Sequence, residues 1–216
     1  MVDVVPVEAA PEVQKESVRL VVMGDSMSDF AEAHGTYPLG NVTDESTMWY
    51  SLLGDRLPWA VESFEAFTLS DVGYTQTESG PGAFWGWNYF VGQTAPDVIL
   101  LALGMDDPWS DPAAIENGLV ATLDTLGQLW PETRVIVIIP PESDFNGVTN
   151  IEGTRAAFNA AWDQAAEAAS ERGVQVIDLR KCTVSRYAKL YMLDDGRHPN
   201  AAGMKAIADY IVNQLK

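Results

Sequence analysis

A serine that could act as a nucleophile follows directly after the first apolar run of the chain. This run, 20–23, ends at Gly24, and Asp25 and Ser26 come next. A buried strand ends in this way when the chain turns sharply and exposes polar side chains. Ligands of open α/β sheets bind just outside the carboxyl ends of the strands, so Ser26 would be placed to attack one. Asp and Ser are also favoured helix-capping residues, and this stretch alone favours a cap over a nucleophile.

A histidine near the C-terminus could supply the base that such a serine needs. Serine hydrolases use an imidazole to accept the hydroxyl proton and a carboxylate to orient the ring. The chain has two histidines, His34 and His198, and Asp195 stands three residues before His198. A tight loop over this spacing would bring the carboxylate to the ring; the adjacent Asp194 fits less well. The same stretch could instead begin a helix with Pro199 in its first turn, and by itself it leaves the two interpretations even.

These residues need a scaffold that brings them together, and the remaining pattern predicts one. Apolar segments typical of buried strands alternate with amphipathic helices, which predicts a parallel sheet with helices on both faces. The fold class is therefore α/β, a three-layer α/β/α sandwich around a five-stranded parallel sheet. Right-handed crossovers would place the ends of the first three strands side by side at one rim. We expect strands at 18–24, 60–69, 97–103, 134–139 and 174–179, and helices at 46–57, from 111–112 to about 130, at 151–172 and from 199–200 onward.

Four blocks of sequence, in the expected order, resemble the SGNH, or GDSL-type, hydrolase superfamily. The resemblance spans residues 18–216 and implies the flavodoxin-like fold of that superfamily. The blocks are Gly24-Asp25-Ser26 for the nucleophile, Asp71-Val-Gly73 for the second block, Gly104-Met-Asp106-Asp107 for the third, and Asp195-x-x-His198-Pro199 for the acid and base. The second block departs from the family pattern, because Asp71 and Gln76 stand where an Asn and a second Gly are usual.

The resemblance implies a serine esterase mechanism without cofactor or metal. Ser26 would attack an ester carbonyl, His198 would carry the proton, and Asp195 would orient the imidazole. The backbone N–H groups of Ser26 and Gly73 would donate to the oxyanion, while Asp25 would tie down the turn. The expected substrates are small acyl esters, such as acetyl or short-chain esters of carbohydrates. An acyltransferase would use the same triad.

Asp106 stands where the family places an Asn that donates a side-chain N–H to the oxyanion. An ionised carboxylate there has no hydrogen to give, and it would repel the oxyanion by about 4 kcal/mol at 4 Å and an effective dielectric of 20. Three outcomes stay open. Asp106 could be protonated through burial beside Asp107 and donate its own hydrogen; it could swing out of the site; or the chain could be a ligand-binding module with weakened catalysis. We expect a slow esterase with an acid-shifted pH optimum.

The composition of the chain disfavours several other classes of function. The 216 residues carry a formal net charge of −18, which disfavours nucleic acid and membrane surfaces as partners. Cys182 is the only cysteine, so no internal disulfide is possible. We expect a flexible arm over 1–16 and a single domain over 17–216, with no signal peptide or transmembrane segment and, by default, a cytoplasmic location. The oligomeric state stays open. Trp109 and the aromatic run 84–90 could stack on sugar rings, although packing accounts for at least half of these rings.

Overall fold

The computed structural model describes residues 15–30, 44–68, 73–75, 94–143 and 149–216. Its centre is a five-stranded parallel sheet with the strand order β2-β1-β3-β4-β5. The strands are β1 (Ser17–Gly24), β2 (Ala60–Thr68), β3 (Val98–Ala102), β4 (Arg134–Ile139) and β5 (Gln175–Asp178). This order places the carboxyl ends of β2, β1 and β3 side by side, as the crossover rule predicts.

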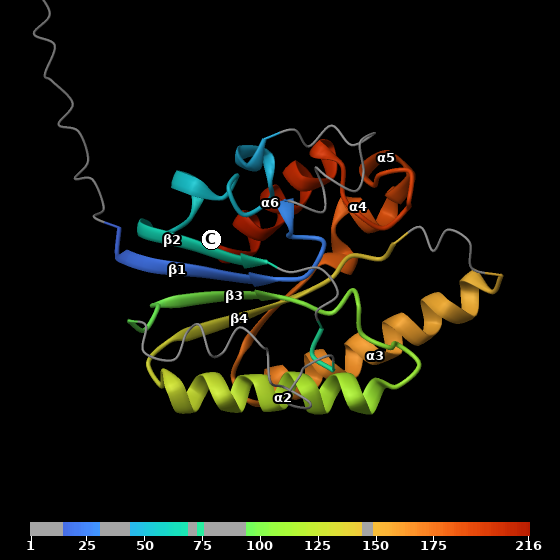
Figure 1. Ribbon diagram of the computed structural model, residues 1–216, viewed down its shortest axis with the longest axis horizontal. Coiled ribbons are helices and arrows are strands. Elements are labelled where there is room, and N and C mark those ends of the chain that lie inside the picture. The colour runs from blue at the N-terminus through green and yellow to red at the C-terminus, as the bar shows by residue number, and fades with distance from the viewer. Residues whose placement is uncertain (1–14, 31–43, 69–72, 76–93, 144–148) are drawn as a thin grey trace, which may run out of the picture.

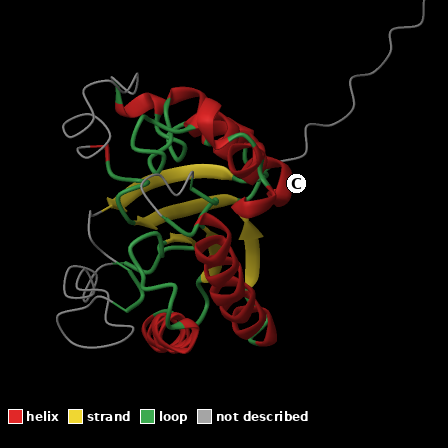
Figure 2. Ribbon diagram, turned by 90° about the vertical axis from the view of Figure 1, so that its right-hand side faces the viewer, coloured by secondary structure: helices red, strands yellow, loops and turns green. Residues whose placement is uncertain are grey.

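Helices cover both faces of the sheet, so the predicted three-layer α/β/α sandwich is confirmed (Figures 1 and 2). One face packs against α2 (Pro112–Leu129) and α3 (Ile151–Glu171), and the other packs against α6 (Ala201–Leu215). Alternate residues of β1 divide between these two cores, because successive side chains of a strand point to opposite faces. Leu20 and Val22 belong to the α6 core, whereas Val21 and Met23 belong to the core beneath α2 and α3.

The helices begin where capping residues predict. The side chains of Asp111, Asn150 and Asn200 accept hydrogen bonds from the first turns of α2, α3 and α6, respectively. Gly173 ends α3 with a φ of +72°, a conformation that costs glycine little. β2 lies at the edge of the sheet and has no buried residue, which agrees with the interruption of its apolar pattern by Glu62 and Glu65.

The predicted helix over 46–57 is wrong. The segment contains two 3-10 turns, η2 (Glu45–Thr47) and η3 (Gly54–Arg56), joined by turns. Three consecutive side chains are buried there: Met48, Trp49 and Tyr50. An α-helix presents residues three or four apart on one face, so it could not bury three in succession against a single core. Packing of the large rings therefore overrides the helical pattern.

Three short helices between β5 and α6 were not predicted: η4 (Leu179–Lys181), α4 (Thr183–Arg186) and α5 (Ala188–Tyr191). Each is too short for a hydrophobic period to show in the sequence. They run across the α6 side of the sheet toward the segment that carries Asp195 and His198 (Figure 1).

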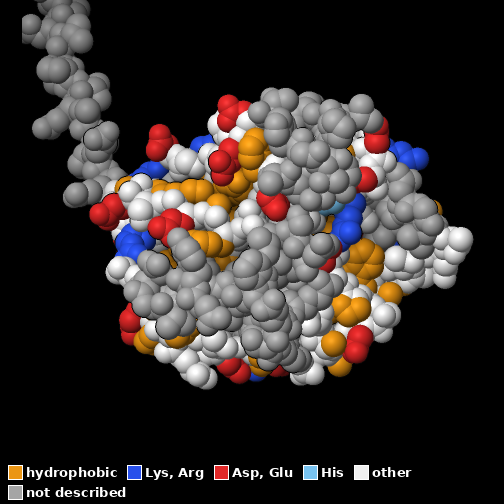
Figure 3. All heavy atoms as spheres, viewed as in Figure 1, with side chains coloured by type: hydrophobic (Ala, Val, Ile, Leu, Met, Phe, Trp, Pro, Cys, Tyr) orange, Lys and Arg blue, Asp and Glu red, His pale blue; other side chains and the backbone are white. Residues whose placement is uncertain are grey.

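Some predictions fall outside the described residues: the arm over 1–14, His34, Asp71 and the aromatic run 84–90. Lys15 and Glu16 are described, and both contact the rest of the chain. The ammonium of Lys15 donates to the carbonyls of Asp55 and Leu57, and the carbonyl of Glu16 accepts from the N–H of Ala60. Among the described helices, none is long and apolar enough to cross a membrane. Among the described residues, acidic side chains are scattered over the face shown in Figure 3.

Candidate active site

Ser26 lies in a tight turn at the carboxyl end of β1. The N–H of Asp25 donates to the carbonyl of Ala102 on β3 at 3.3 Å, and the N–H of Ser28 donates back to the carbonyl of Asp25 at 2.9 Å. The turn leaves the side chain of Ser26 beside the ring of His198, with only 6% of Ser26 exposed. The sequence context of Ser26, a strand that stops at a glycine, thus places its hydroxyl at the rim of the sheet.

Asp25 fastens this turn to the neighbouring strand end, the structural role expected for it. One carboxylate oxygen accepts from the N–H of Met27 at 3.0 Å and the other from the N–H of Met105 at 2.8 Å. Burial raises the pKa of Asp25 to about 7, helped by the charge of Asp106, while these N–H donors and Arg197 lower it less. A single buried carboxyl group therefore joins the nucleophile turn to the third block.

Asp195 and His198 lie in one tight loop. The N–H of Leu193 donates to the carbonyl of His198 at 2.7 Å, which closes the loop, and Gly196 turns it with a φ of +69°. One oxygen of Asp195 accepts from the N–H groups of Arg197 and His198, at 2.9 and 3.0 Å. Burial alone would raise the pKa of Asp195, but hydrogen bonds from the His198 ring and these two N–H groups lower it to about 2.

The loop and the turn meet in a continuous relay of hydrogen bonds. Asp195 Oδ2 lies 2.5 Å from His198 Nδ1, and His198 Nε2 lies 2.9 Å from Ser26 Oγ. With the carboxylate next to Nδ1, the ring carries its proton there, and Nε2, which faces Ser26 Oγ, is the nitrogen that can accept the serine proton. The structure thus brings Ser26, His198 and Asp195 together as predicted, and Asp194 is exposed to solvent.

Asp107 holds the second block against the third. Its carboxylate accepts from the N–H of Tyr74 at 2.9 Å, from the N–H of Thr75 at 2.8 Å and from the hydroxyl of Thr75 at 2.6 Å. Gly73 lies directly against this carboxylate, since a Cβ built on Gly73 would come within 2.5 Å of an Asp107 oxygen. The structure therefore explains the glycine at position 73 by close approach, and it places this residue next to the turn that carries Asp106.

The carboxylate of Asp106 is paired with the guanidinium of Arg197, a partner that the sequence reasoning missed. Arg197 Nη2 also donates to the carbonyl of Met105 at 3.1 Å. The three outcomes considered for Asp106 did not include such a pair, and a neighbouring guanidinium favours the ionised carboxylate. The only signal in the sequence was the position of Arg197 between Asp195 and His198.

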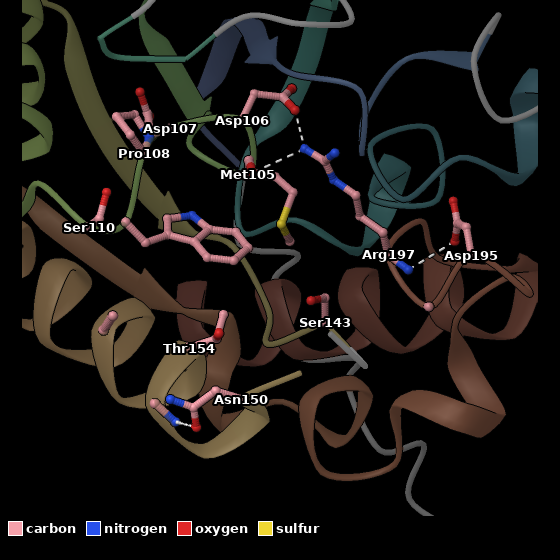
Figure 4. Close-up of a pocket in the computed structure, with 14 residues that line it drawn as sticks. Met105, Asp106, Asp107, Pro108, Ser110, Ser143, Asn150, Thr154, Asp195 and Arg197 are labelled. Carbon is pink, nitrogen blue, oxygen red and sulfur yellow. Dashed lines mark hydrogen bonds and ion pairs between the residues drawn. The ribbon is translucent and has the colours of Figure 1, made fainter. Parts of the chain in front are cut away.

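A cavity of about 730 Å³ opens beside the relay, on the side of α3. Figure 4 shows Arg197 reaching across it toward Asp106 and Met105, with Asn150 and Thr154 on the opposite wall. The lining mixes polar side chains with apolar ones such as those of Met105, Trp109 and Ala157. Within the described ranges, no three His, Cys, Asp or Glu side chains group to hold a metal ion.

The fold and the relay together define a class of protein. A serine, a histidine and an aspartate joined in this order, at the carboxyl rim of a parallel α/β sheet, are the arrangement of serine hydrolases. The chain belongs to the GDSL-like lipase/acylhydrolase family, whose model matches residues 22–206.

Solved structures with the same fold agree with this family. A member of the lipolytic protein G-D-S-L family from Veillonella parvula is 16% identical, with a TM-score of 0.67 over 90% of this chain and 96% of that one. LAE5, an alpha/beta hydrolase from the metagenome of Lake Arreo, is 19% identical, with a TM-score of 0.66 over 94% and 98% of the two chains. The psychrotrophic esterase EstA from Pseudoalteromonas is 15% identical, with a TM-score of 0.63 over 90% and 94%. No curated protein matches the sequence.

Proposed function

We propose that the chain is a serine esterase that hydrolyses acyl esters through an acyl-enzyme on Ser26. The observation that carries this proposal is the unbroken relay from Asp195 through His198 to Ser26, with contacts of 2.5 and 2.9 Å. A relay of this geometry can remove the hydroxyl proton as the oxygen attacks, which is what an unactivated serine cannot do at neutral pH.

The proposed mechanism follows the geometry of the relay. Ser26 Oγ attacks the ester carbonyl, and His198 Nε2 takes the proton and later delivers it to the departing alkoxide. Water then adds to the acyl-enzyme by the reverse proton path. The low pKa of Asp195 keeps its carboxylate charged through the working range of pH, so it stabilises the imidazolium that forms.

Backbone N–H groups are the proposed donors to the oxyanion. In the described part of the chain, no hydrogen bond uses the N–H of Ser26 or of Gly73. Asp25 and Asp107 fix the two segments that carry these N–H groups. Fixed donors of this kind stabilise charge that develops in the transition state without the cost of reorganising.

For the substrate, we propose short acyl esters of carbohydrates. The cavity beside the relay has room for one or two sugar rings, because ligand pockets of this volume hold ligands of that size. Its wall offers an aromatic face, Trp109, together with an amide and a hydroxyl, Asn150 and Thr154. Such a combination suits a ring with apolar faces and hydroxyl edges.

Labelling with an organophosphonate tests the catalytic proposal. The structural neighbour EstA was crystallised as an enzyme inhibited by monoethylphosphonate. We expect a p-nitrophenyl alkylphosphonate to release one equivalent of p-nitrophenol from this chain and to modify the peptide that contains Ser26, as measured by mass spectrometry. Ser26→Ala should take no label, whereas Ser170→Ala, which changes an exposed serine on α3, should label fully. A wild-type chain without label at Ser26 would point to a ligand-binding module.

A comparison of two esters tests the substrate class. We expect a higher kcat/KM for an acetylated xylobiose than for ethyl acetate. Thr154→Val removes a hydroxyl from the cavity wall at constant side-chain volume, so it should lower kcat/KM about tenfold for the sugar ester and leave p-nitrophenyl acetate unchanged. Equal effects on both esters would contradict the carbohydrate assignment but not the esterase mechanism.

A further inference from the structure

The Asp106–Arg197 pair is held at the edge of the cavity beside the relay. The side chain of Asp106 is only 9% exposed, and that of Arg197 is 40% exposed. A carboxylate this far from solvent stays ionised only with a charged or hydrogen-bonding partner. The guanidinium supplies that partner from the loop that also carries the acid and the base (Figure 4).

We propose that Arg197 is a positioning residue for ester hydrolysis, one that makes an aspartate at position 106 compatible with an oxyanion beside Ser26. This inference rests on the proposed esterase function. The guanidinium cancels the charge of the carboxylate and turns it toward Arg197, so the developing oxyanion does not face an uncompensated negative charge. Arg197 acts through Asp106, and the oxyanion itself is bound by the backbone N–H groups.

Hydrogen bonds from Arg197 to other residues also connect the separate segments of the site. The N–H of Arg197 donates to Asp195, and its Nη2 donates to the carbonyl of Met105, whose own N–H is held by Asp25. The side chain of Arg197 therefore links the acid/base loop to the third block and, through Asp25, to the nucleophile turn. The guanidinium that pairs with Asp106 thus also joins the loop of the base to the turn of the nucleophile.

A double-mutant cycle tests the inference, with turnover of p-nitrophenyl acetate as the readout. Arg197→Met removes the cation beside Asp106, and we expect kcat to fall about 100-fold with KM changed less than threefold. Adding Asp106→Asn to that variant restores a neutral side chain that can donate an N–H, so the double variant should recover to within about tenfold of wild type. Arg197→Lys keeps the cation and should lose much less than Arg197→Met.

A matched control separates this effect from the loss of any surface ion pair. Arg56 pairs with Asp209, neither residue lines the cavity, and the side chain of Arg56 is 41% exposed, about the same as that of Arg197. Arg56→Met should leave kcat unchanged. Thermal melts of all variants show which of them fold.

The results of these experiments distinguish a failure of the proposed role of Arg197 from a failure of the proposed esterase function. A wild-type chain without turnover or Ser26 labelling would defeat the esterase proposal itself. An active wild type with Arg197→Met at full kcat, or with a double variant no faster than Arg197→Met, would overturn the role of Arg197 alone. If Arg197→Met does not fold, Arg197→Gln, which also removes the cation, replaces it: a loss of kcat that Asp106→Asn reverses supports the inference, and no loss, or one that Asp106→Asn does not reverse, overturns it.

Discussion

The carboxylate of Asp195 accepts hydrogen bonds from residues two and three positions further along the chain. The carboxylate of Asp107 is held instead by residues 32 and 33 positions away. The partner of Asp106 is 91 positions away. The acid/base loop is thus a local structure that closes on itself. The other side of the site, which carries Gly73, Asp106 and Asp107 and is the proposed oxyanion side, is assembled from separate segments that meet only when the sheet forms. One half of the site is folded by its own sequence, and the other half depends on the register of the strands beneath it.

This difference has a physical consequence for how each half responds to change. A local loop loses little chain entropy when it closes, so its geometry is robust and its side chains can be read from spacing. A group that joins distant segments fixes several of them at once, and its loss is felt by all. The comparison predicts chemical defects from changes in the acid/base loop and combined defects of activity and stability from changes on the oxyanion side.

The largest expected effect is a chemical defect in the local loop. Asp195→Asn keeps the size of the side chain but loses the charge, and its amide NH2 can donate to Nδ1 and favour the unproductive tautomer of His198. We expect kcat to fall by about 10⁴-fold, as in other triads, with the loop still folded. Ester hydrolysis and near-ultraviolet circular dichroism measure the two effects. Asp194→Asn is the matched control on an exposed neighbour and should change kcat less than twofold; equal losses from the two variants would show that Asp195 is not the acid.

An intermediate loss of kcat is expected when one methyl group is added on the oxyanion side, where there is no room for it. In Gly73→Ala the new Cβ would lie 2.5 Å from an oxygen of Asp107, so the carboxylate that holds Tyr74 and Thr75 must move. We expect kcat to fall about 10- to 100-fold and the free energy of unfolding to fall by about 1–3 kcal/mol. Urea denaturation and ester kinetics on the same samples measure both.

Gly127→Ala controls for the substitution itself. Nothing lies within 4 Å of a Cβ at position 127 in α2. This variant should gain about 0.5–1 kcal/mol from helix propensity and keep its kcat. A Gly73→Ala variant as active and as stable as wild type would contradict the close approach to Asp107 as a requirement of the site.

Asp25→Asn, which changes the residue that joins the nucleophile turn to the third block, is expected to have the smallest effect on turnover. Its effect on stability should be distinct, because it depends on pH. The folded pKa of Asp25, about 7, is above the ordinary value near 4, so its contribution to stability is full below pH 4 and is lost as the pH rises toward 7. Asp195 has the opposite sign: its folded pKa of about 2 gives a contribution that is present above pH 4 and lost as the pH falls toward 2.

Urea denaturation from pH 3 to pH 8 separates these two contributions. We expect Asp25→Asn to remove a decline in the free energy of unfolding as the pH rises from 4 to 7. Asp195→Asn should remove an increase in that free energy as the pH rises from 3 to 4. An unchanged slope between pH 4 and pH 7 in Asp25→Asn would show that the buried carboxyl group does not bind its proton more tightly in the folded state.

Several features could be predicted from the sequence because their causes lie within a few residues. Apolar runs that stop at Gly24 and Gly104 marked the strand ends, and capping residues such as Asp111 marked the helix starts. The spacing of Asp195 and His198 was sufficient to place the acid beside the base, because a tight loop has few conformations. The family pattern then connected Ser26 to this distant pair.

Other features were decided only by the tertiary structure, because they depend on which surfaces meet. The segment 46–57 has a helical pattern, yet the burial of Met48, Trp49 and Tyr50 against the α6 core breaks it into 3-10 turns. The charge of Asp106 could not be assigned from its neighbours in the chain, because its partner, Arg197, approaches from the far end of the domain. Local sequence determined the loop of Asp195 and His198. Long-range packing assembled the other half of the site and decided what environment the aspartate at position 106 meets, since the energy of a buried charge is set by the groups around it in space.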